Sequence, residues 1–190
     1  MESQYKNGEV EGLYTEWYPS GEKMGECHYK DGKQEGLLTL LYPSVKLLSK
    51  SHFKSGIENG IETQWFETGQ KQIQSHYENG VLIGIQTEWY ETGEKKTEMN
   101  YEDGVLNGMK TTWFNSGGKD VEESYKNGEL EGVVTTWYEF GQKKSVGHYK
   151  DGKLDGVVTE WDETGNQVKE VYCKNGEPEG LMDKFKRFFK

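Results

Sequence analysis

The sequence predicts an all-β protein, an open single-layer antiparallel meander of tandem 24-residue β-hairpin repeats. Three observations favour this fold class: glycine pairs recur at a fixed interval, six tryptophans share one place in that interval, and apolar residues alternate with polar ones before each tryptophan. The Gly-x-x-x-Gly pairs are Gly8/Gly12, Gly32/Gly36, Gly56/Gly60, Gly80/Gly84, Gly104/Gly108, Gly128/Gly132, Gly152/Gly156 and Gly176/Gly180. The tryptophans are Trp17, Trp65, Trp89, Trp113, Trp137 and Trp161, with Leu41 in the second repeat and Phe185 in the eighth.

The first repeat shows the elements in order. Residues 13–18 alternate with a period of two, which predicts a strand with Leu13, Thr15 and Trp17 on one face. A turn follows at 19–22, a second strand runs from Lys23 to Tyr29, and Asp31-Gly32 predicts a tight turn. The Gly-x-x-x-Gly stretch is expected to connect hairpins, and the Trp and Tyr rows to form a thin aromatic core.

Identical units with short links favour an open array, although closure into a barrel stays an alternative. The predicted organisation is a repeat array over residues 1–180, about seven full units plus a partial eighth. A basic amphipathic tail over residues 181–190 follows, with apolar residues at the spacing of a short helix.

Composition and charge exclude several classes of function. The formal net charge of −10 argues against binding to nucleic acid. The N-terminus lacks a signal-peptide pattern and no apolar run reaches membrane-spanning length, so we expect a cytoplasmic protein. Cys27 and Cys173 fit neither a disulfide framework nor a zinc motif, which leaves only a lone distant disulfide open.

No motif for catalysis or cofactor binding is found in the sequence, so we expect a protein that is not an enzyme and holds no cofactor or metal. Four histidines share one repeat position, namely His28, His52, His76 and His148. Neighbouring copies would lie about 9.6 Å apart, too far to share a zinc ion, so we expect an exposed polar row. Proton-linked switching near pH 6 is the alternative.

The string Gly-x-x-x-Gly-x-x-Thr-x-Trp-Tyr-x-x-Gly-x-Lys, clearest over 80–95 and 128–143, resembles the MORN-repeat variant of bacterial tandem-repeat proteins. The resemblance covers residues 5–180. Many such proteins are described as YwqK-type antitoxin components, and MORN repeats elsewhere are implicated in protein contacts, scaffolding and attachment to phospholipid membranes. It implies an elongated array of β-hairpins and no catalytic residue.

Two departures from the repeat are the candidate binding sites. The second repeat is rich in leucine, and Leu38, Leu40, Leu47 and Leu48 are predicted to contact a partner protein or a second copy, with local repacking around the missing Trp as the alternative. In the tail, Phe185, Phe188 and Phe189 are further partner-binding candidates. Lys184, Lys186, Arg187 and Lys190 are candidates for contact with a membrane or a partner. Capping of the last hairpin is the structural alternative for the tail.

These observations favour a non-catalytic repeat scaffold that binds another protein of unknown identity, with neutralisation of a toxin as one form of that function. The alternative is a membrane-associated tethering protein that uses its basic tail.

Overall fold

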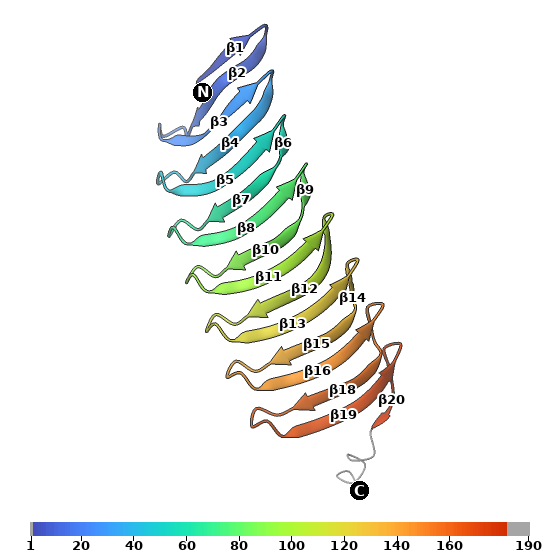
Figure 1. Ribbon diagram of the computed structural model, residues 1–190. Helices are drawn as coiled ribbons and strands as arrows, with labels where there is room; N and C mark the ends of the chain where they lie inside the picture. The colour runs from blue at the N-terminus through green and yellow to red at the C-terminus, as the bar shows by residue number, and fades with distance from the viewer. Residues whose placement is uncertain (1, 182–190) are drawn as a thin grey trace. The chain divides into compact units, whose positions relative to one another are not determined.

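The computed structural model describes residues 2–181, all of them in strands and turns, and this part of the chain contains no helix (Figure 1). Two compact units divide the chain, Met1–Gly93 and Glu94–Lys190. The strands of the first unit are β1 (Glu2–Lys6), β2 (Glu9–Trp17), β3 (Lys23–Lys30), β4 (Lys33–Leu41), β5 (Leu47–Lys54), β6 (Ile57–Glu58), β7 (Gly60–Trp65), β8 (Lys71–Glu78), β9 (Val81–Leu82) and β10 (Gly84–Trp89). Those of the second unit are β11 (Lys95–Glu102), β12 (Val105–Trp113), β13 (Lys119–Lys126), β14 (Glu129–Leu130), β15 (Gly132–Trp137), β16 (Lys143–Lys150), β17 (Lys153–Leu154), β18 (Gly156–Trp161), β19 (Gln167–Lys174) and β20 (Glu177–Leu181).

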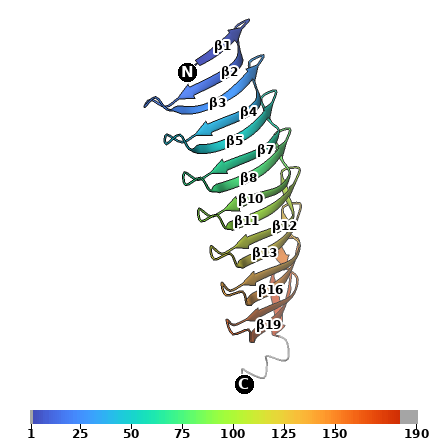
Figure 2. The ribbon, with the colours of Figure 1, turned by 60° about the vertical axis from the view of Figure 1, so that its left-hand side comes forward.

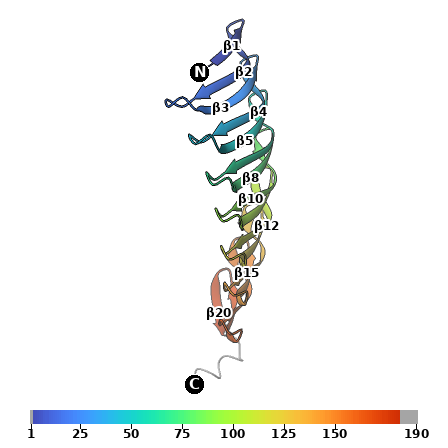
Figure 3. The ribbon, with the colours of Figure 1, turned by 90° about the vertical axis from the view of Figure 1, so that its left-hand side faces the viewer.

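Each unit is an open antiparallel meander of strands that follow one another in sequence. Short strands such as β6 and β7 are two pieces of one interrupted strand, and both pair with β5. Within a unit, the turns that follow the Trp strands lie along one edge and the Asn-Gly or Asp-Gly turns along the other (Figure 2). Seen from the side, each unit is one layer, and no other described element of the same unit covers either of its faces (Figure 3). The predicted all-β open meander is therefore confirmed for each unit.

The Gly-x-x-x-Gly stretch is not the loop-like connector that we expected. The first glycine of the stretch belongs to a two-residue turn. Asp31 and Gly32 have φ values of 48° and 71°, the left-handed combination of a type I′ hairpin. Lys30 pairs with Lys33 immediately after that turn, so the stretch already belongs to the next strand. Its second glycine, such as Gly12 at φ 86°, keeps the left-handed backbone inside the strand.

A β-bulge recurs just after the four-residue turn of each hairpin. Glu16 pairs with Gly25 but Trp17 pairs with Lys23, which leaves Met24 as the extra residue. The bulge puts the extra residue and the next one on the same face. In the fifth repeat this is visible directly, because Thr112 donates a hydrogen bond to the extra residue, Asp120, at 3.5 Å.

The sheet therefore has two distinct faces. We call one the Trp face; in the first repeat it carries Leu13, Thr15, Trp17, Lys23, Glu26 and His28. We call the other the variable face; in the first repeat it carries Tyr14, Glu16, Met24, Gly25, Cys27 and Tyr29, and later repeats carry the residues at steps of 24.

The buried positions are small and mostly polar, which corrects the expected aromatic core. They include Thr15, Thr63 and Thr87 on the Trp face and Ser49, Ser51, Ser75 and Thr97 on the variable face, with Cys27, Val171 and Cys173 as the buried apolar residues among those described. The tryptophans are only half-buried, and the apolar row that begins at Leu13 is exposed, with Ile85 57% accessible. In a single-layer sheet, a long side chain is covered only by its lateral neighbours. Only short side chains are therefore buried.

Successive repeats are joined by bonds of fixed geometry. The hydroxyl groups of Tyr18, Tyr42 and Tyr138 each donate to a main-chain oxygen 23 residues ahead, at 2.7, 2.8 and 3.0 Å. On the Trp face, the Lys71 and Lys119 ammonium groups lie 5.5 Å from the centroids of Trp89 and Trp137, so a cation–π contact also links neighbours. The lysine and tryptophan rows are thus parts of the architecture.

The predicted C-terminal helix cannot begin at Leu181, because that residue ends β20 and pairs with Val171. The remaining tail candidates, Lys184 to Lys190 with Phe185, Phe188 and Phe189, lie outside the described residues. Cys27 and Cys173 are both free thiols, so the lone disulfide is not formed. No helix in the described part of the chain has the length and hydrophobicity needed to span a membrane.

Candidate functional site

Three of the four predicted leucines meet on the variable face of the second repeat. Leu38 and Leu40 lie on β4, opposite the buried Ser51 and Ser49 of β5. Leu48 is the extra residue of the bulge, which keeps it on the face of Ser49. We call Leu38, Leu40 and Leu48 the leucine cluster. All three side chains are half-buried.

Leu47 does not belong to this cluster. It pairs with Leu41, the residue that replaces tryptophan, and so lies on the Trp face. Consecutive residues of a strand lie on opposite faces, so ordinary alternation separates Leu47 from Leu48, whereas the bulge keeps Leu48 on the face of Ser49.

Leu40 is positioned by a glycine in the preceding repeat. Gly25 is buried and pairs with Leu40, and a Cβ built on Gly25 would lie 2.6 Å from Leu40 Cδ2 and 2.9 Å from the Thr39 main-chain oxygen. The absence of a side chain at Gly25 is what lets Leu40 lie flat on the sheet. Part of the leucine cluster is therefore packed within the first unit.

Aromatic and acidic groups border the leucine cluster. Tyr14 and Tyr29 make an edge-to-face contact with ring centroids 5.5 Å apart. The Tyr14 hydroxyl donates to Glu16 at 2.5 Å, and this hydrogen bond is the main cause that raises the pKa of Tyr14 to about 12. Burial raises the pKa of the Cys27 thiol, so this cysteine is a protonated, packed group.

Glu58 and Glu62 lie beyond the leucine cluster on the same face, because Glu58 pairs with Phe53 and Glu62 with Ser75. Partial burial, followed by the negative charge of Glu62, raises the pKa of Glu58 above its ordinary value. The carboxylates of the variable face in the first unit are Glu16, Glu58, Glu62 and Glu88. None of its variable-face positions between 10 and 90 holds lysine or arginine, so this surface is apolar and anionic.

Rows of the two faces differ in how much their residues change from repeat to repeat. On the Trp face, the position of Trp17 keeps tryptophan in six repeats. On the variable face, the position of Tyr14 holds in turn Leu38, Glu62, Gln86, Lys110, Val134 and Val158. Leu38, Glu62, Lys110, Val134 and Val158 pair with equivalent residues of the next strand, so the backbone does not require any one of these residue types.

The histidine row lies on the Trp face and is exposed, as expected. Its rings point along the sheet, since His52 Nδ1 lies 3.3 Å from the Ile61 oxygen and His148 Nδ1 lies 3.4 Å from the Val157 oxygen. Among residues 2–181, no group of three or more potential metal ligands comes together.

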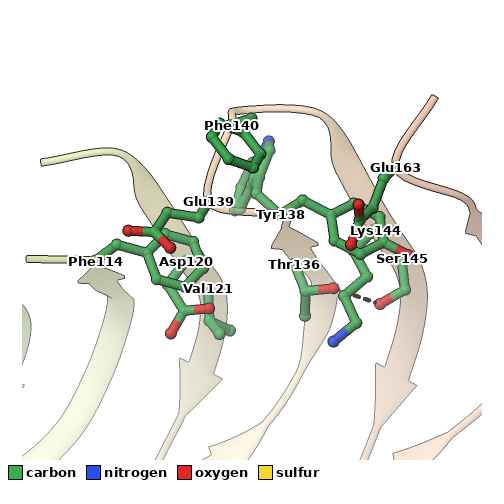
Figure 4. Close-up of a pocket in the computed structure, with 11 residues that line it drawn as sticks. Phe114, Asp120, Val121, Thr136, Tyr138, Glu139, Phe140, Lys144, Ser145 and Glu163 are labelled. Carbon is green, nitrogen blue, oxygen red and sulfur yellow. Dashed lines mark hydrogen bonds between the residues drawn. The ribbon is translucent and has the colours of Figure 1, made fainter. Parts of the chain in front are cut away.

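Sequence reasoning missed one candidate residue, Phe140. Its turn position holds serine or threonine in every other repeat of the described chain, at Ser20, Ser44, Thr68, Thr92, Ser116 and Thr164. Phe140 is 86% exposed and borders a hollow in the second unit (Figure 4). Comparison of the turns alone, rather than of the strands, would have identified it.

The MORN repeat variant model matches four segments of this chain, residues 10–31, 58–79, 82–103 and 130–151. The matched segments are the first, third, fourth and sixth repeats, a little less than half of the chain. The second repeat, with its leucines, is not among them. Repeats of this family are generally scaffolds that bind proteins or membranes. A search of curated proteins found no match.

Proposed function

We propose that this chain is a non-catalytic scaffold that binds another protein through the variable face of its repeats. The observation that carries the proposal is a contrast between rows: the Thr15 and Trp17 rows of the Trp face repeat, whereas the Tyr14 and Cys27 rows of the variable face differ between repeats with the same pairing. The aromatic row that begins at Tyr29 is the constant part of the variable face. A recurring residue serves the fold that all repeats share. A residue that changes within a constant backbone is available for a contact made at only one place.

The leucine cluster is the proposed centre of contact in the first unit. Apolar side chains at the centre of a protein interface contribute most when polar groups surround them and exclude water. Tyr14 and Tyr29 provide aromatic surface beside the cluster, and Glu58 and Glu62 provide negative charge on its other side. The partner that fits this surface presents apolar side chains flanked by cations.

The test uses replacements that other repeats already carry. Glutamine occurs naturally at the Leu38 position, as Gln86, and at the Leu48 position, as Gln72. Leu38→Gln with Leu48→Gln should therefore preserve the fold while removing the apolar centre. Leu37→Gln, on the Trp face of the same strand, is the matched control. Leu40 is left unchanged because it packs over Gly25.

The readouts are capture of proteins from the native host, identified by mass spectrometry, and elution volume over a range of concentrations. Loss of a captured protein or of self-association in the Leu38/Leu48 variant, with the Leu37 control unaffected, supports the proposal. Equal capture and equal elution volume for all three proteins would remove the leucine cluster from the function. If the captured protein is a toxin, and the wild-type chain neutralises it but the Leu38/Leu48 variant does not, the result would support the antitoxin function that the family resemblance suggests.

The second candidate is membrane tethering by the tail, favoured by four cations and three phenylalanines within residues 184–190. Flotation with anionic liposomes, with and without residues 182–190, tests it directly. Equal flotation of the two chains would exclude the tether.

A further inference from the structure

The turn at Phe140 carries a residue that the fold does not need. Gly141 donates its main-chain N–H to the Tyr138 oxygen at 2.8 Å, and the equivalent bonds close the turns at Gly21, Gly69 and Gly117 at 2.9, 2.8 and 2.9 Å. Those turns hold serine or threonine where Phe140 stands. A phenyl ring that is 86% exposed therefore adds nothing to closure of the turn and places apolar surface in water.

A hollow of about 640 Å³ opens beside this ring. Its walls come from the turns and strand ends of three successive hairpins in the second unit, and Phe114, Tyr138 and Phe140 provide aromatic surface. Figure 4 shows Tyr138 between two groups of side chains, with Asp120 and Glu139 toward Phe114, Lys144 and Glu163 on the other side, and Phe140 at the tip of the turn. A second hollow of about 380 Å³ shares Tyr138 and Lys144.

The walls are held in place before any ligand arrives. The Tyr138 hydroxyl donates to the Trp161 oxygen at 3.0 Å, which fixes the ring toward the next hairpin. Thr136 and Ser145 are joined by a 2.7 Å hydrogen bond at the base of the hollow. The third turn is closed by Asp162, whose carboxylate accepts the Asn166 N–H at 2.9 Å. A pocket with walls held in this way loses less conformational entropy when it binds a ligand.

The charges select the kind of ligand. Asp120, Glu139 and Glu163 bring three carboxylates to the hollow, whereas Lys144 brings one ammonium group. No ion pair joins any of these three carboxylates to a residue in the range 2–181. Lys144 lies 5.7 Å from the centroid of Tyr138, so the aromatic surface already attracts a cation.

We propose that this hollow, together with Phe140, binds an arginine side chain on a basic segment of a partner protein. A guanidinium group is flat, stacks on aromatic rings and donates to two carboxylate oxygens at once, which the rings and carboxylates of the hollow both satisfy. Lysine offers one compact charge without a flat face, and an anionic ligand would meet three negative groups. The inference rests on the proposed function, since it assumes a protein partner, but it concerns a different surface from the leucine cluster.

The test measures binding of two short fluorescent peptides to the full chain by fluorescence anisotropy at low salt. One peptide carries arginine between glycines, and the other carries citrulline, the neutral isostere of arginine, in the same places. A third peptide with lysine separates the flat guanidinium from charge alone. The arginine peptide should bind at least roughly threefold to tenfold more tightly than the other two.

Three variants identify the surface. Phe140→Ser restores the residue type of the other turns, so the fold should persist. The affinity of this variant for the arginine peptide should be severalfold lower. Lys144→Gln removes the competing cation and should strengthen binding, an effect that simple loss of structure cannot produce. Tyr5→Ser, which removes a 63% exposed aromatic residue of β1, is the matched control and should change nothing.

Equal affinity for arginine and citrulline peptides, or an unchanged affinity in Phe140→Ser, overturns the inference. Equal affinity for the lysine peptide overturns the assignment to arginine. Either result leaves the leucine cluster intact as a binding surface, because its test uses Leu38 and Leu48 and a different readout. Conversely, arginine binding that persists in the Leu38/Leu48 variant confirms that the two surfaces are separate.

Discussion

Leu40 lies directly over Gly25 of the neighbouring strand, so closely that a Cβ on Gly25 would stand 2.6 Å from Leu40 Cδ2. The contact joins the first repeat to the second and explains why a glycine occupies a position that holds serine in the next repeat, at Ser49.

Gly25→Ala should therefore lower the free energy of unfolding by about 1–3 kcal/mol, the usual cost of overpacking. The close approach of the Thr39 main-chain oxygen, at 2.9 Å, prevents relief by side-chain rotation alone. Urea denaturation of the full chain measures the change. Gly147→Ala is the control, because a Cβ built on Gly147 would lie 3.1 Å from its nearest neighbour, the end of the Leu154 side chain. This variant should lose clearly less stability than Gly25→Ala. Equal costs would show that the Leu40 contact is not tight in solution.

Each tyrosine hydroxyl that joins two repeats should contribute measurably to the free energy of unfolding. Tyr18→Phe removes the 2.7 Å hydrogen bond to the Leu41 oxygen and should cost about 0.5–1.5 kcal/mol. Phe66 holds the same position in the third repeat, so Phe66→Tyr should gain a similar amount by donating to the Trp89 oxygen. Thermal unfolding of the two variants measures the expected loss of stability in Tyr18→Phe and the expected gain in Phe66→Tyr. A loss of stability in Phe66→Tyr would contradict the equivalence of the repeats.

The turn of the second repeat is strained. Val45 has φ of 64°, where the corresponding turns have glycine, and a β-branched residue is rare in this conformation. The left-handed backbone costs an ordinary L-residue about 1–2 kcal/mol, and Val45 is exposed, so little packing is lost with its side chain. Val45→Gly should therefore stabilise the chain by about 1 kcal/mol. The reverse change in the next turn, Gly69→Val, should destabilise it, and urea denaturation of both variants tests the pair.

Glu58 should make stability depend on pH in a defined direction. Burial, together with the charge of Glu62, raises the pKa of Glu58 in the folded chain. A raised carboxyl pKa means that the folded state holds the proton more tightly, so the stabilising contribution is complete at acidic pH and is lost as pH rises through the folded pKa. Glu58→Gln should thus raise the melting temperature at pH 7 and lose this advantage below about pH 4. Glu78→Gln, at an exposed position, is the control. A constant difference at all pH values would show that the charge of Glu58 is not responsible.

Local sequence determined the elements of this fold. The 24-residue interval, the alternation around Trp17 and the Asp31-Gly32 type of turn each act over a few residues, so their consequences could be predicted before any contact was known. The leucine cluster was predicted on the same basis. The prediction of an aromatic core was wrong in detail because alternation tells which residues share a face, not how deeply one layer can bury them.

Only the tertiary structure decided which of the unusual residues meet. Alternation in the sequence had grouped Leu38, Leu40 and Leu48, but Leu47 was predicted as a binding residue with them, and strand pairing puts it opposite Leu41 on the other face. The approach of Leu40 to Gly25 and the hollow beside Phe140 arise between hairpins 24 residues apart, where each hairpin supplies part of the surface. The sequence by itself determined the repeating scaffold, because the forces that form a hairpin are local. The structure decided the binding surfaces, because these exist only where neighbouring hairpins come together.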